Sequence, residues 1–67
     1  MTHTLTQAEA IQIDLDNLYF TRRYLKGCLD EMEYLGRTHT KGYKLTKHNL
    51  EVINSNIRHL AAQLEKL

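Results

Sequence analysis

A chain of 67 residues with one cysteine, no proline and no tryptophan is too short for more than one domain and cannot close an intrachain disulfide. Chains of this size bury only about 60% of the surface that they expose when unfolded, so a core of their own is marginal and self-association or a protein partner is expected. The four histidines show no spacing that would place two metal ligands together, and we expect neither a metal nor a cofactor.

The formal net charge is only +1, but the charges are unevenly distributed. Residues 1–35 contain six acids and three bases, residues 36–50 contain four bases and no acid, and residues 51–67 contain two of each. The first residues are polar, and no apolar run approaches the ~18 residues of a membrane span. We therefore expect no signal peptide, no membrane contact and a cytoplasmic location, where a lone thiol stays reduced.

The first predicted helix covers about residues 6–35. Thr6 and Glu9 have the spacing of a capping box, in which each side chain binds the backbone amide of the other residue. Gly36 can adopt the left-handed conformation that ends a helix. Between these signals apolar residues recur at alternating steps of three and four, which is typical of a helix with a buried side: Ala8, Ile11, Leu15, Leu18, Leu25, Leu29 and Met32.

Arg22 occupies the place in this apolar series where one member is missing. Neither Arg22 nor Arg23 has an acid three or four positions away, so the first helix supplies no partner for either of them. Three interpretations are open for Arg22. Its stem lies on the helix seam while its head reaches water, a carboxylate or carbonyl of the facing helix holds it, or it contacts a ligand such as phosphate. We favour a partner across the helix interface.

A basic connector is predicted for about residues 36–45 and a second helix for about residues 46–67. Thr46 is a good N-cap, and Leu45 and Leu50 have the positions of a hydrophobic staple. A connector this short predicts that the two helices fold back antiparallel. The chain is therefore assigned to the all-α class, as a single helical-hairpin domain over its whole length. The second helix has one apolar series: Leu50, Ile53, Ile57, Leu60, Leu64 and Leu67.

The first helix has a further set of apolar residues, displaced well around the cylinder, which we call the second stripe: Ile13, Phe20, Tyr24, Cys28 and Leu35. One facing helix can cover only one of the two sets, and an apolar band this wide is typical of a helix with more than one neighbour. We expect two hairpins to associate through the second stripe, with Arg22 at the same interface, into a homodimeric four-helix bundle. Two alternatives stay open: the aromatic rings fold over the hairpin edge, or the stripe binds a different protein.

Basic residues surround Tyr43 in the predicted connector, namely Arg37, Lys41, Lys44 and Lys47 together with His39 and His48. Cations interleaved with an aromatic ring can bind phosphates and stack on a base, and a helix N-terminus favours an anion. A solvated loop is the alternative interpretation. The near-neutral total charge and the acidic first helix also count against a long duplex as ligand.

These patterns favour a small, non-enzymatic interaction module, which acts as a regulator, adaptor or inhibitor by docking on another macromolecule through its first helix. The alternative function is nucleic-acid or nucleotide binding through the basic connector. Catalysis is not expected, because two helices cannot enclose a substrate. Asp14 and Asp16 also point to different sides of a helix, so they make a poor acid–base pair.

Overall fold

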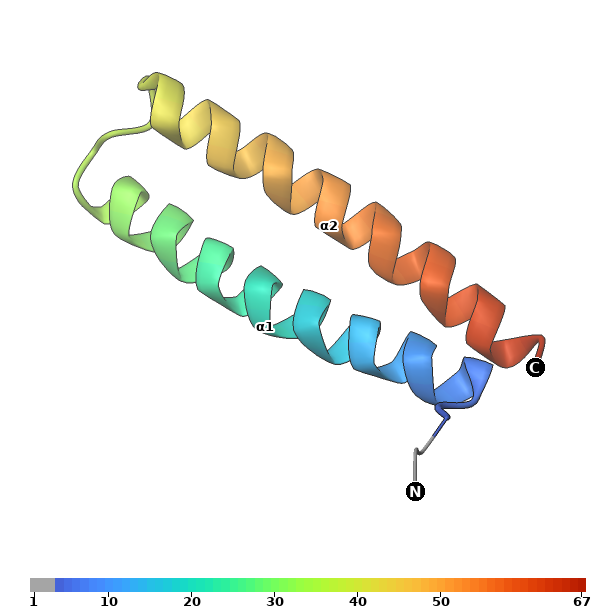
Figure 1. Ribbon diagram of the computed structural model, residues 1–67. Helices are drawn as coiled ribbons and strands as arrows, with labels where there is room; N and C mark the ends of the chain where they lie inside the picture. The colour runs from blue at the N-terminus through green and yellow to red at the C-terminus, as the bar shows by residue number, and fades with distance from the viewer. Residues whose placement is uncertain (1–3) are drawn as a thin grey trace.

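The computed structural model describes residues 4–67, which form two α-helices packed side by side (Figure 1). Helix α1 spans Gln7–Tyr34 and helix α2 spans Lys41–Glu65. The helices are antiparallel, so that the start of α1 lies beside the end of α2 (Figure 1), and the hairpin measures 51 × 26 × 15 Å. This arrangement confirms the predicted all-α hairpin. Neither helix is long and apolar enough to cross a membrane over the described residues.

The ends of α1 follow the predicted signals. The Thr6 hydroxyl accepts the backbone N–H of Glu9, and the Glu9 carboxylate accepts the backbone N–H of Thr6, both at 3.1 Å. At the other end Gly36 has a φ of 73°, and the N–H of Arg37 returns to the carbonyl of Met32 at 2.8 Å. This is the hydrogen bond of a Schellman cap, which satisfies a carbonyl that the helix leaves unpaired.

Gly36→Ala should therefore destabilise the hairpin by about 1–2 kcal/mol, because a Cβ is unfavourable in the left-handed conformation. Gly42→Ala is the matched control. An added Cβ there meets only Thr40 Oγ1 at 4.0 Å, and alanine is the better helix former, so we expect no loss of stability. Thermal unfolding followed by circular dichroism measures both variants. Equal losses in the two variants would contradict the assigned cap.

Helix α2 begins earlier than predicted, and the connector is correspondingly shorter. The N-cap is Thr40, whose hydroxyl accepts the N–H of Tyr43 at 3.1 Å. Thr46 lies inside the helix, where its hydroxyl donates to the carbonyl of Gly42 at 2.8 Å. The predicted start at Thr46 and the Leu45 staple were therefore wrong. A glycine in a helix costs only about 1 kcal/mol, and the longer helix brings Tyr43 against α1.

The core of the hairpin is small and lies along the seam between the helices. The side chains that are buried are Ile11, Leu15, Leu29 and Ile57. Ile11, Leu15 and Ile57 form one cluster, and four partly buried side chains pack against it: Leu18, Ile53, Leu60 and Leu64. These residues belong to the two predicted apolar series, which form the main seam. Leu67, the last member of the second series, is an exception, because it lies beyond the end of α2 and is 62% exposed.

Candidate functional site

The second stripe of α1 is exposed in the hairpin. The exposed fraction is 73% for Phe20, 66% for Tyr24, 52% for Leu35 and 46% for Ile13, and Cys28 is partly exposed. Side chains this accessible are not covered by the edge of the hairpin, so the two aromatic rings do not fold over it. The stripe is therefore a set of accessible apolar side chains, centred on the two aromatic rings, along one side of α1.

The stripe lies on the side of α1 that is turned away from α2. Successive residues of a helix are separated by roughly 100°, which directs Ile11, Leu15 and Leu18 to the seam and the second stripe about 130–140° away from them. Helix α2 cannot reach that side. Gly27 lies beside the stripe, and an added Cβ there would meet nothing within 4 Å. A partner that covers the stripe would therefore pack on α1 alone.

Helix α2 has exposed apolar side chains of its own, which the sequence analysis missed. Leu45 is 61% exposed and Val52 is 43% exposed. They are seven residues apart and so lie on the same side of α2. Leu45 was interpreted as part of a staple and Val52 was assigned to no stripe. Their seven-residue spacing was the signal that could have found them.

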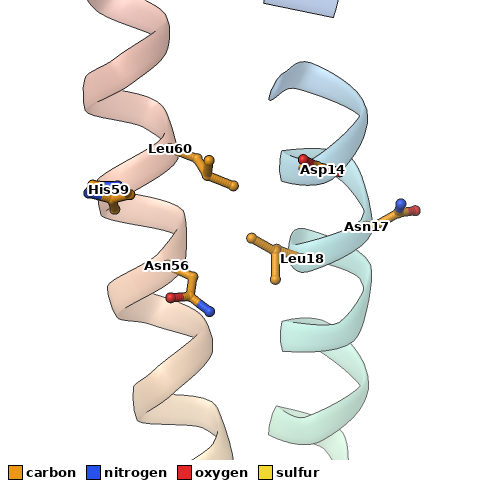
Figure 2. A pocket seen from close by; sticks show the side chains of 6 residues that line it. All are labelled: Asp14, Asn17, Leu18, Asn56, His59 and Leu60. Carbon is orange, nitrogen blue, oxygen red and sulfur yellow. The ribbon is translucent and has the colours of Figure 1, made fainter. Parts of the chain in front are cut away.

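An open groove of about 360 Å³ lies between the two helices (Figure 2), lined by Asp14, Asn17, Leu18, Asn56, His59 and Leu60. The side chains of Leu18 and Leu60 point into the space between the helices, whereas those of Asn17 and His59 point away from it (Figure 2). Within residues 4–67, no three histidine, cysteine, aspartate or glutamate side chains are grouped so that they could hold a metal ion. The two leucine side chains make the inside of the groove apolar, and polar residues lie along its edges.

Arg22 lies in the seam and finds its partner on α2. Its Nη1 atom donates to Oδ1 of Asn54 at 3.5 Å, and its guanidinium carbon is 5.0 Å from the centroid of the Tyr19 ring. The partner is a side-chain amide and not the carboxylate or backbone carbonyl that was considered. The long hydrogen bond joins the two helices, whereas the cation–π contact, worth about 0.5–1 kcal/mol at exposed sites, lies within α1. Helical geometry places Arg22 almost opposite the second stripe.

Arg22 also borders an open depression on the surface of α1, together with Tyr19, Arg23, Lys26, Gly27 and Asp30. The lining contains three cationic side chains and one carboxylate, so its net charge is positive. If Arg22 contacts a ligand such as phosphate, the ligand would bind in this depression. All of the residues that line the depression belong to α1.

The five candidate phosphate contacts are divided between the connector and the start of α2. Arg37 lies in the connector, whereas Lys41, Tyr43, Lys44 and Lys47 lie in the first two turns of α2. Residues that are three positions apart on a helix differ in direction by roughly 60°. The three lysines are three positions apart, so their side chains diverge around the helix. The hydroxyl of Tyr43 donates to Oε1 of Glu33 at 3.0 Å. The aromatic ring of the set is therefore held by an acid of α1.

The contact with Glu33 raises the pKa of Tyr43 above its ordinary value of 10.0, mainly through the hydrogen bond, with partial desolvation and the carboxylate charge adding to it. Because the pKa is higher in the folded state, the contact stabilises the hairpin below about pH 10, and this contribution disappears as the pH rises through the folded pKa. Glu33→Gln should move the Tyr43 pKa back toward 10.0 in an NMR titration of its ring carbons. Glu31→Gln is the control. A Tyr43 titration that is unchanged in Glu33→Gln would disprove the contact.

Comparison of the chain with protein-family models, with curated proteins and with solved structures finds no match.

Proposed function

We propose that this protein is a small, non-enzymatic interaction module that docks through the second stripe of α1, and that its hairpins pair through this stripe as a homodimer. The observation that carries the proposal is the exposure of the stripe, where Ile13, Phe20, Tyr24 and Leu35 are 46% to 73% accessible. Apolar side chains gathered on one side of a helix are typical of a protein-binding surface. Such a module acts as a regulator, adaptor or inhibitor when another macromolecule takes the place of the second copy on the stripe.

The accessible area of the hairpin supports a partner. The chain exposes 5551 Å², whereas a globular monomer of 7.9 kDa is expected to expose roughly 4,400 Å². The excess is roughly 1,100 Å², which is comparable to the ~800 Å² that each partner buries in a standard stable interface. Covering the second stripe would bring the exposed area close to that of an ordinary small protein.

Nucleic-acid binding through the basic residues has less support than protein binding. Tyr43 is engaged by the carboxylate of Glu33, and a carboxylate beside a phosphate site repels the ligand. The lysines of the first turns of α2 also point in different directions. The basic residues at the start of α2 therefore surround a tyrosine whose hydroxyl is already hydrogen-bonded to an acid of α1.

Photo-crosslinking of the purified chain tests the proposal. Benzoylphenylalanine in place of Phe20 should give a covalent dimer on illumination, because this position lies at the centre of the stripe. The same amino acid in place of Ser55 is the matched control, since Ser55 is exposed on α2 and away from the stripe. Equal products from both positions, or no product from position 20, would count against the second stripe as a docking surface.

A further inference from the structure

The second stripe is symmetric about Tyr24. Phe20 and Cys28 lie four residues before and after it, and Ile13 and Leu35 lie eleven residues before and after it. In a two-fold antiparallel pair of identical helices, a residue before the axis meets the residue equally far after the axis in the partner. The stripe is thus complementary to itself when two copies of α1 run in opposite directions.

We infer that the occupant of the second stripe is a second copy of this chain, packed antiparallel on α1 with the two-fold axis at Tyr24. This inference rests on the proposed function and specifies the partner and its orientation. Ile13 then faces the partner's Leu35, and Tyr24 faces its own copy across the axis. Because the stripe lies away from the seam, the two α1 helices are central and the two α2 helices lie outside them.

The sizes of the side chains favour this orientation over the parallel one. In the antiparallel pair the ring of Phe20 meets the partner's Cys28, next to Gly27, where nothing lies within 4 Å of an added Cβ. A large side chain therefore fills the space above a small one. In a parallel pair each Phe20 would meet the partner's Phe20, and each Cys28 would meet the partner's Cys28. The first contact would be overpacked and the second would leave a gap, and both are unfavourable in a close-packed interface.

The polar residues in the same rows of α1 favour the antiparallel orientation as well. Asn17 and Glu31 lie seven residues before and after Tyr24, and both are exposed. The antiparallel pair brings each Asn17 amide, a hydrogen-bond donor, to a Glu31 carboxylate, an acceptor. A parallel pair would bring the two Glu31 carboxylates together, which costs free energy through like-charge repulsion.

The orientation decides where the two connectors lie. An antiparallel dimer places the two connectors, each with Arg37 and the nearby Lys41, at opposite poles. An α-helix rises 1.5 Å per residue, so positions near residue 37 should be roughly 40 Å apart in this dimer and under about 20 Å apart in a parallel one. The separation of the two connectors therefore distinguishes the orientations.

A distance measurement between spin labels tests the inference. The Arg37→Cys/Cys28→Ala variant, in which alanine keeps a small apolar side chain in the stripe, is labelled with nitroxide. Its mass is measured by light scattering, and the label separation is measured by pulsed electron resonance. We expect a dimer with a separation of roughly 40 Å. A dimer with labels under about 20 Å apart overturns the orientation and leaves the proposed function standing, whereas a monomer overturns both the orientation and the self-association.

The unmodified chain provides a second test that needs no substitution. In the antiparallel dimer the two Cys28 residues are roughly 12 Å apart along the helix axis, beyond the ~7 Å between Cα atoms that a disulfide allows. Mild oxidation should therefore leave the dimer without an intersubunit disulfide. Rapid formation of a Cys28–Cys28 disulfide would overturn the antiparallel orientation, because only the parallel pair brings these thiols together.

Discussion

The Phe20→Asp variant should be a monomer that keeps both helices. Phe20 is 73% exposed in the isolated hairpin, so an aspartate is tolerated there by the hairpin itself. In the proposed dimer the same position is covered, and burial of an unpaired carboxylate is strongly unfavourable. Each dimer contains two such substitutions. We therefore expect the dissociation constant to rise at least ~100-fold, equivalent to about 2.7 kcal/mol.

Sedimentation equilibrium measures the mass of the Phe20→Asp variant, and circular dichroism measures its helix content. Ser55→Asp is the matched control, because it places the same charge on an exposed position of α2 outside the second stripe. It should keep the mass and the helix content of the unmodified protein. If Phe20→Asp also keeps the native mass, the second stripe does not mediate self-association.

The Leu15→Ala variant should lose most of its folded population. Leu15 is 3% exposed and lies in the core with Ile11 and Ile57. Removal of a buried leucine side chain costs about 2–5 kcal/mol, a large part of the ~5–15 kcal/mol that stabilises an ordinary domain. A core of so few buried residues cannot distribute that loss over many neighbours.

Urea unfolding compares Leu15→Ala with Leu45→Ala, which removes the same atoms from a side chain that is 61% exposed. The Leu45 variant should change the free energy of unfolding by no more than about 0.5 kcal/mol. Similar losses in the two variants would mean that the core is not confined to the seam of one hairpin.

The sequence predicted the elements that depend on local chemistry. The capping box of Thr6 and Glu9 and the left-handed Gly36 act within a few residues, so both ends of α1 could be read directly. The start of α2 could not, because Thr40 and Thr46 both satisfy the N-cap pattern. The outcome there depends on packing against α1, through contacts such as that of Tyr43 with Glu33, which are distant in the sequence.

In the candidate site, too, the features set by local sequence were predicted and those set by packing between the helices were not. The surplus apolar residues of α1 follow from periodicity alone, and their exposure in the hairpin agrees with it. The partner of Arg22 depends on the alignment of the two helices, which no local pattern specifies, so Asn54 could not be singled out among the residues of α2. The exposed Leu45 and Val52 were missed because a wrong helix start assigned Leu45 to the connector.

Size-exclusion chromatography with light scattering, with absorbance recorded at two ultraviolet wavelengths, tests most directly whether the second stripe binds a second copy. The expected result is a single species with twice the 7.9 kDa mass of one chain and the absorbance ratio of pure protein. A mass of one chain at every concentration would contradict self-association through α1. Co-eluting nucleic acid that high salt removes would instead support the basic residues around Tyr43 as the binding site.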